Sequence, residues 1–251
     1  MLFKGILKDF IYFFLEKLLP FKANQAVILM YHSIGGQGEF FQVTAPEFAE
    51  QMAYLANNDF NVIGLPKLAA ALSAGASLPK KTIAITFDDG YLDNYTQAWP
   101  VLRQYHFLAT IFVNTAELGQ TRTARGGQQL ALMSAKEILE MDRHGLIDFG
   151  SHCHHHQKLV NLSVLEMEEE FSQSKKALED LLEKKSEILA YPVGRYNDSV
   201  KSTAKKYFTA ALSVTPGAVR PGDDLMALKR NSVDQAVSFI QFKGLVKFGK
   251  L

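Results

Sequence analysis

The chain has 251 residues, seven histidines, one cysteine and a formal net charge of +1. That length suits one large α/β domain and makes a second full domain unexpected. The apolar fraction of 47% indicates a folded core, and the near-neutral charge argues against a nucleic-acid partner. The single cysteine, Cys153, excludes an intrachain disulfide and leaves the redox compartment open.

Both ends of the chain combine apolar and charged side chains. Charges interrupt the N-terminal run too often for a cleavable signal peptide or a membrane-spanning helix, so we expect a cytoplasmic or peripherally membrane-associated protein. On a helical projection these charges lie opposite the large apolar side chains. This predicts an amphipathic helix over 1–25, either in a membrane interface or docked on the domain. A basic amphipathic tail is predicted at 237–251, and both ends could contact one bilayer.

Between the ends, strand and helix patterns alternate. Apolar and β-branched runs predict strands at 26–30, 61–64, 82–87, 108–114, 146–149, 188–191 and 209–214. Three of the intervening helices begin with a capping box, in which Ser or Thr precedes Glu by three residues: Thr44 and Glu47, Ser134 and Glu137, Ser163 and Glu166. Further helices are predicted at 66–72 and 94–105. This alternation predicts a closed or nearly closed α/β barrel with its site at the carboxyl ends of the strands.

Two polar clusters follow predicted strands. Asp88 and Asp89 precede Gly90 after the strand at 82–87, and the run Gly-Ser-His-Cys-His-His-His at 150–156 follows the strand at 146–149. Either cluster alone has a simpler explanation, as a turn or as a histidine-rich surface patch. Together they predict a metal site, in which one carboxylate binds the metal and its neighbour accepts a proton from the metal's water.

The histidine spacing adds to this prediction. His152 and His156 are four residues apart, so a helical turn would bring their imidazoles together as metal ligands. His154 and His155 lie between them and are expected to face solvent.

With these clusters, the chain resembles the polysaccharide deacetylases of the NodB-homology type over about residues 26–233, and we place the domain at 26–236. In that family, the first Asp of a T-F-D-D-G motif is the base and the second a metal ligand, which match Asp88 and Asp89. An S-H-[ST]-x-x-H motif supplies two further ligands, which match His152 and His156. The resemblance implies a distorted (β/α) barrel and a metal-dependent hydrolase that removes acetyl groups from the N-acetylated amino sugars of a polysaccharide. The implied cofactor is a divalent metal, with Zn²⁺ preferred to other divalent transition metals.

Three features of the sequence depart from the family pattern. Cys153 replaces a Ser or Thr, and a thiolate beside the metal could bind or poison the site. Ala190 stands two residues before Pro192, where many members have an Arg. This moves the chain toward the branch that deacetylates poly-β-1,6-N-acetylglucosamine.

No histidine follows His156, although many members take their general acid from a C-terminal Leu-x-His segment. His32 is the predicted substitute, since it follows a strand and that branch gives its N-terminal Tyr-His such a role.

Further predictions concern the substrate and the base. The substrate-binding candidates are Tyr31, Tyr91, Pro192, Val193 and Tyr196, with ordinary tyrosine packing as the alternative for the aromatic ones. A backbone N–H near Val193 is predicted to stabilise the oxyanion. Arg230 is a candidate for orienting Asp88, and a surface salt bridge is the preferred alternative.

Two other functions remain open from the sequence. A deacetylase of a lipid-linked sugar at a membrane would explain the amphipathic ends. A carbohydrate-binding relic would explain the missing C-terminal histidine. The four intact residues Asp88, Asp89, His152 and His156 argue against the relic, because a binding protein does not need the metal ligands.

Overall fold

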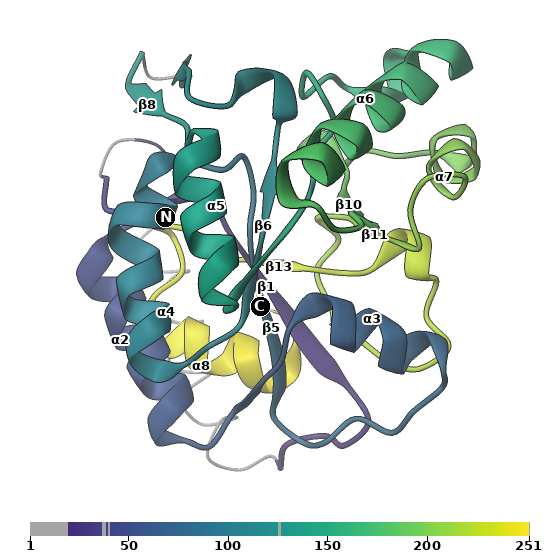
Figure 1. Ribbon diagram of the computed structural model, residues 1–251. Coiled ribbons are helices and arrows are strands. Elements are labelled where there is room, and N and C mark those ends of the chain that lie inside the picture. Colours follow the sequence, from purple (N-terminus) through teal and green to yellow (C-terminus); the bar gives the residue numbers. More distant parts are fainter. Residues whose placement is uncertain (1–19, 37–38, 40, 125–126, 251) are drawn as a thin grey trace.

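The computed structural model describes residues 20–36, 39, 41–124 and 127–250. Figure 1 shows a central curled sheet surrounded by helices. The predicted N-terminal helix falls mainly on residues 1–19, which lie outside the described residues. Its last predicted part, 20–25, is not helical, and Phe21 there packs edge-on against Phe60 with ring centroids 5.5 Å apart.

The main sheet runs in the order β11-β10-β9-β6-β5-β1-β12, with β13 also on β1 and β4 also on β5. All of its pairings are parallel except that of β1 with β12. Its strands are β1 (Ala26–Tyr31), β4 (Asn61–Val62), β5 (Thr82–Phe87), β6 (Ala109–Val113), β9 (Ile147–Ser151), β10 (Ile188–Ala190), β11 (Ala210–Leu212), β12 (Ala218–Val219) and β13 (Asn231–Ser232). Each predicted strand is present, within a few residues of its predicted bounds.

A short segment spans the gap in the curl between β11 and β1. Leu228 forms a parallel bridge with Leu212 of β11, and three residues later β13 pairs with β1. The sheet is therefore a distorted barrel, as predicted. The spanning segment carries Arg230 between its two points of contact.

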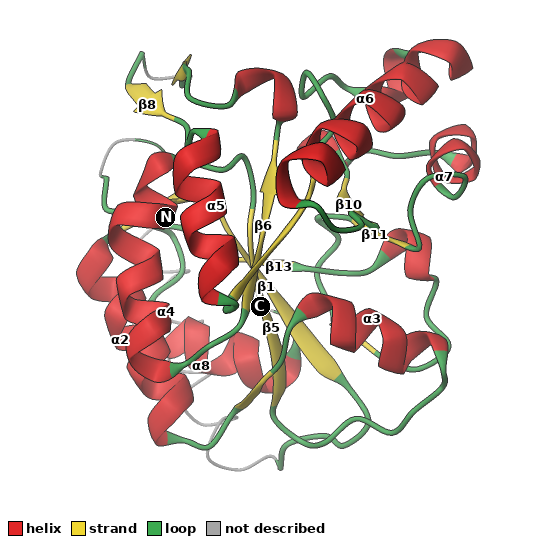
Figure 2. Ribbon diagram, in the orientation of Figure 1, coloured by secondary structure: helices red, strands yellow, loops and turns green. Residues whose placement is uncertain are grey.

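Helices cover the outer face of this sheet (Figure 2). They are α2 (Ala45–Asn57), α4 (Trp99–Tyr105), α5 (Ala135–His144), α6 (Val164–Leu182) and α8 (Phe239–Phe248), with α7 (Asp198–Ala204) beside α6. α3 (Leu65–Ser73) packs instead on the inner face. Short helical turns are η1 (Asn94–Ala98), η2 (Thr115–Glu117), η3 (Leu159–Asn161), η4 (Pro192–Gly194) and η5 (Leu225–Ala227). All three predicted capping boxes are confirmed, at the starts of α2, α5 and α6.

Two small sheets lie outside the barrel, and the sequence predicted neither. They are formed by β2 (Ser33–Ile34) with β3 (Gln42–Val43), and by β7 (Thr121–Thr123) with β8 (Gln129–Ala131). The second is an antiparallel hairpin between β6 and α5. It places one further charged side chain, Arg122, at the functional site.

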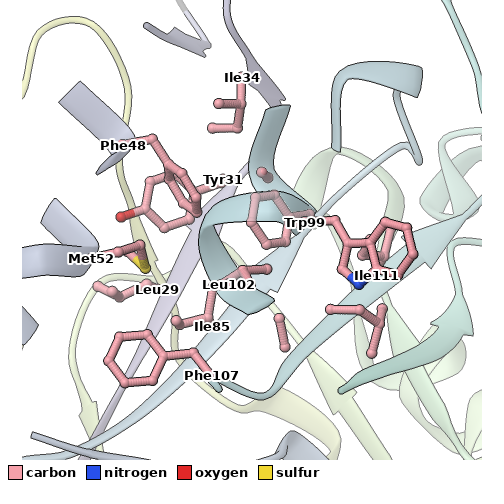
Figure 3. Close-up of a cluster of buried hydrophobic side chains, with 14 of the residues drawn as sticks. Leu29, Tyr31, Ile34, Phe48, Met52, Ile85, Trp99, Leu102, Phe107 and Ile111 are labelled. Carbon is pink, nitrogen blue, oxygen red and sulfur yellow. The ribbon is translucent and has the colours of Figure 1, made fainter. Parts of the chain in front are cut away.

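Strand alternation separates the outer core from the barrel interior. Leu29, Tyr31 and Ile85 point outward and pack with α2 and α4, as Figure 3 shows. Their neighbours Ile28 and Ala84 face inward, toward α3 and the far strands β10 and β11. Successive side chains of a strand point to opposite faces. His32 and Asp88 follow β1 and β5 at inward-facing positions of this alternation. Both side chains therefore point toward the mouth of the barrel, its opening at the carboxyl ends of the strands.

The C-terminal tail is a helix docked on the domain. In α8, Phe242, Leu245 and Val246 are buried in the outer core, and the Phe242 ring lies 6.3 Å from that of Tyr54 in α2. Contact with α2 and β1 already covers the apolar face that we predicted for a bilayer. The predicted membrane contact through this end is therefore not supported. Among the described residues, no helix is both long and apolar enough to cross a membrane.

Candidate metal centre

Three side chains converge at the carboxyl ends of β5 and β9. The Nε2 atom of His156 lies 3.5 Å from Asp89 Oδ1, and that of His152 lies 3.9 Å from the same oxygen. One donor atom from each residue falls within a mutual distance of 4.8 Å. Two imidazoles and one carboxylate suit a divalent transition metal, and three protein ligands leave coordination positions open, as a catalytic site requires.

The turn after β5 orients the carboxylate. Asp89 has a left-handed φ of 73°, and Gly90 follows at 72°. A Cβ atom on Gly90 would lie 2.7 Å from the Val113 side chain, so only glycine fits beside β6. Tight packing thus aims Asp89 across the strand ends toward the histidines.

The two histidines are brought together by an irregular loop rather than the predicted helical turn. Residues 152–156 form no helix, and both Cys153 and His156 have left-handed φ values, 67° and 54°. A left-handed residue with a side chain is unfavourable by about 1 kcal/mol or more. The loop therefore depends on contacts from its surroundings.

Both histidines present a neutral nitrogen to the site. His152 Nδ1 lies 2.7 Å from the Ala190 carbonyl, and a proton on that nitrogen leaves the Nε2 lone pair facing Asp89. Burial lowers the pKa of His152, and burial together with neighbouring His152 lowers the pKa of His156 to about 4. A metal needs unprotonated imidazoles, so the ligands are ready near neutral pH.

Asp88 and Arg230 form a buried, bidentate ion pair. Arg230 Nη1 donates to Asp88 Oδ1 at 2.6 Å and Nη2 donates to Oδ2 at 2.7 Å. The Arg230 side chain is completely buried, so the surface salt bridge that we preferred is wrong and the orienting role has the required geometry. Burial is the largest single effect and would raise the pKa of Asp88, but the charge and hydrogen bonds of Arg230, with the charges of His152 and His32, together outweigh it and hold the pKa below its usual value.

Replacing Arg230 with Met should destabilise the metal-free protein by about 3–5 kcal/mol at pH 7, since it leaves a buried carboxylate unpaired. The folded pKa of Asp88 is depressed, so the pair stabilises the fold above the unfolded pKa of about 4 and the contribution disappears as pH falls through the folded pKa. Denaturant unfolding at pH 7 and pH 3 measures both effects. Introducing Asp88→Asn into the Arg230→Met variant should recover part of the lost stability. If the effects of the two substitutions on stability were strictly additive, a direct pairing would be contradicted.

Arg122 is a charged neighbour of the ligands that the sequence did not reveal. Its Nη1 donates to Asp89 Oδ1 at 2.6 Å, and its Nε donates to Glu117 Oε2 at 3.0 Å. Burial raises the pKa of Asp89, but His156, His152 and Arg122 outweigh it and the net shift is strongly downward. Short alternating segments around glycine at 121–131 could have indicated a hairpin, but nothing in them shows that Arg122 faces the metal ligands.

Among the five substrate-binding candidates, Tyr31 requires correction. It is completely buried, its ring stacks with Phe87, and its hydroxyl donates to Gln51 Oε1 at 2.7 Å. Because Tyr31 and His32 are adjacent in sequence, strand alternation sends them to opposite sides of the sheet. A tyrosine in the outer core is not placed to flank a sugar.

Tyr91 lies beside the ligands but is almost fully buried. Its ring stacks on Phe41 at 5.8 Å, and burial followed by the Asp89 charge raises its pKa. Tyr196 is partly exposed and stacks on buried Tyr191 at 5.1 Å.

The other two substrate candidates form η4, directly after β10. Pro192 is buried, whereas Val193 is 47% exposed and has a left-handed φ of 60°. This conformation is rare for a β-branched residue and is typical of functional sites. Within the described residues, the Val193 N–H has no hydrogen-bond partner.

His32 reaches the same end of the barrel as Asp88. The backbone N–H of Asp88 donates to the carbonyl of Tyr31, the residue before His32. The His32 ring is partly buried and lies 5.7 Å from that of Phe41. The charge of a protonated His32 would lower the pKa of both Asp88 and Asp89, although other neighbouring charges have larger effects. His32 and the two acids therefore share one end of the barrel.

The remaining residues of the histidine loop point away from the ligands. Cys153 is completely buried in an apolar cluster with Leu159 and Phe171, and burial raises the pKa of its thiol well above the usual value. A neutral thiol in a separate core does not interfere at the metal. His154 is half-buried and His155 is exposed, but each has a hydrogen-bond partner on the protein.

One cavity among the described residues lies away from the metal ligands. It measures about 450 Å³ and is lined by α3 and by the amino-terminal parts of strands, including Thr110, Asp148 and Ile188. Asp148 is the second residue of β9, whereas His152 follows the end of that strand, so the cavity extends toward the amino-terminal ends of the strands and away from the ligands. Chemistry, not cavity size, identifies the site here.

The chain is similar to known proteins in sequence and in fold. The polysaccharide deacetylase family model matches residues 75–211, more than half of the chain. A Bacillus subtilis protein provisionally named as a polysaccharide deacetylase is 31% identical over 227 residues, 90% of this chain and 77% of its own. The poly-β-1,6-N-acetyl-D-glucosamine N-deacetylase of Staphylococcus epidermidis is 29% identical over 86% of this chain and 81% of its own.

A solved structure agrees with these sequence relatives. The Streptococcus pyogenes deacetylase PplD, solved in complex with acetate, superposes with a TM-score of 0.79 at 25% identity and covers 92% of this chain and 100% of its own. The sequence match, the barrel and the converging ligands agree, and the chain belongs to the polysaccharide deacetylase family.

Proposed function

We propose that this protein is a metal-dependent N-deacetylase that acts on a polysaccharide of N-acetylated amino sugars. The observation that carries the proposal is the convergence of Asp89, His152 and His156 beside a buried, ionised Asp88. Zn²⁺ is our first choice of metal, because two imidazoles and a carboxylate form one of its usual catalytic ligand sets. The poly-β-1,6-N-acetylglucosamine relative supplies the proposed substrate.

The residues divide the reaction between them. A divalent metal held by the three ligands would lower the pKa of a bound water and polarise the acetyl carbonyl. Asp88, kept ionised and oriented by Arg230, accepts the proton of the attacking water. The Val193 N–H, which has no partner among the described residues, donates to the developing oxyanion. Tyr91 and Tyr196 remain proposed contacts near the sugar, and Pro192 shapes the loop that carries Val193.

His32 is the proposed general acid. The sequence has no histidine after His156, and His32 lies at the same barrel mouth as Asp88. It would protonate the leaving amine, because an unprotonated amide anion leaves slowly. We expect His32→Ala to reduce turnover roughly 10²-fold or more with little change in metal content. Turnover in the variant should also lose the basic limb of the wild-type pH profile, which reports loss of the acid's proton.

A matched control and a contrary outcome make the His32 test decisive. His144 is exposed and packs edge-on against Trp99 on the outer face, so His144→Ala should leave turnover unchanged. An unaltered rate in His32→Ala would assign the acid to another group.

Acetate release from defined oligomers tests the substrate. We expect the zinc-loaded protein to release acetate from β-1,6-linked N-acetylglucosamine oligomers faster than from β-1,4-linked oligomers of equal length. The reverse preference would keep the deacetylase and reject the proposed glycan. No acetate from either series, at any pH and with any divalent metal, would reject the enzyme.

A further inference from the structure

The loop that carries both histidine ligands is attached to α6 by a buried carboxylate. Glu170 is 5% exposed, and its Oε2 accepts hydrogen bonds from the backbone N–H groups of His154 and His155, each at 2.9 Å. Its Oε1 lies 2.7 Å from His155 Nδ1. The carboxylate thus contacts two of the three residues that lie between the ligands.

These contacts are charge-assisted and local. Among the described residues, the only ion-pair partner of Glu170 is the exposed imidazole of His155, and no lysine or arginine neutralises it. Hydrogen bonds to an ionised acceptor are roughly twice as strong as neutral ones. Two adjacent backbone N–H groups that donate to one oxygen restrain the backbone of the loop.

A second contact one turn along α6 holds the start of the loop. The Ser174 hydroxyl lies 2.7 Å from the Ser151 hydroxyl, and Ser151 Oγ accepts the Cys153 N–H at 3.0 Å. From the other side, the N–H groups of Thr115 and Ala116 donate to the Cys153 and His154 carbonyls. Glu170 is the only charged group among these supports.

The loop needs such support. Cys153 and His156 both have left-handed backbones, which a free loop would abandon for more favourable conformations. Any relaxation would move His156 relative to His152, whose ring is held independently by the Ala190 carbonyl. The distance between the two imidazoles therefore depends on the contacts that support the loop, and those of Glu170 are the charged ones among them.

We propose that Glu170 is a positioning residue that presets the His152–His156 separation for the metal through the backbone of His154 and His155. It does not bind the metal itself, since its oxygens are occupied by loop donors and it is not one of the three converging ligands. The proposal rests on the metal-binding role of the proposed function.

Metal affinity of the full chain tests the proposal. We expect Glu170→Gln to weaken Zn²⁺ binding about tenfold and Glu170→Ala by up to about 100-fold, the range found for residues that support metal ligands. Gln is milder because its carbonyl oxygen can still accept both backbone N–H groups. The matched control is Glu169→Ala, which removes an exposed carboxylate from the next position of the same helix. Competition with a chelator measures the dissociation constants without any substrate.

Hydrogen exchange in the metal-free protein separates positioning from general stability. In Glu170→Gln, the amides of His154 and His155 should exchange faster, while those of β5 and β6 keep their wild-type protection. Faster exchange throughout the chain would show a merely structural role and overturn the proposal. Wild-type affinity in both Glu170 variants would also overturn it. A wild-type protein that binds no Zn²⁺ would reject the metal site, and Glu170's proposed role with it.

Discussion

Replacing Asp89, His152 or His156 with Ala should each weaken metal binding by on the order of 100-fold or more and abolish nearly all turnover. Loss of a supporting residue alone costs 10–100-fold in metal affinity, and loss of a ligand should cost at least as much. The three donors lie within 4.8 Å of one another, so one metal ion can contact all of them. Metal analysis after dialysis against a weak chelator measures the effect.

Matched variants separate the ligands from other residues of the same type. His144→Ala removes an exposed histidine on the outer face, and Asp180→Ala removes an exposed carboxylate of α6. Both should retain a full complement of metal. Wild-type metal content in all three ligand variants would rule out the metal site. Loss of metal in only one variant would show that other residues supply the remaining ligands.

Asp88→Asn should retain metal and lose about two to four orders of magnitude in turnover. The expected loss follows from removal of a general base, whose contribution is typically 10²–10⁴-fold. Asn cannot accept the proton of the water, although its carbonyl oxygen can still accept one hydrogen bond from Arg230. Initial rates of acetate release, measured on wild-type and variant samples with equal zinc content, give the change in turnover.

A complication of this variant is the charge left on Arg230. Without its carboxylate, the buried guanidinium is uncompensated, so some loss of stability is expected alongside the kinetic effect. Thermal unfolding of the same samples checks that the protein is folded at the assay temperature. A folded, zinc-loaded Asp88→Asn protein with near-normal turnover would show that another group is the base.

Local patterns in the sequence were sufficient to predict the barrel and the convergence of the three candidate ligands. Capping boxes and short apolar runs depend on interactions within a few residues, and they predicted α2, α5, α6 and the parallel strands correctly. Once the strands are parallel, their carboxyl ends share a rim. The acids after β5 and the histidines after β9 therefore had to be neighbours.

Short elements without such signals escaped prediction. The hairpin of β7 and β8 has three residues in each strand, too few to show a clear period. Its residue Arg122 reaches Asp89 only because the hairpin folds back over the site. The apolar face of the C-terminal helix was visible in the sequence, but a large apolar moment does not distinguish a bilayer from a neighbouring helix.

What the sequence by itself determined was the residue types of the candidate ligands and the alternation of strands and helices, because both follow from residue type and near neighbours. Tertiary structure alone decided which groups support that chemistry. Arg230 and Asp88 are 142 residues apart in the sequence, and Glu170 contacts the histidine loop from helix α6. Such partners are chosen by the closure of the barrel and the packing of α6, and contacts between distant segments leave no periodic trace in the sequence.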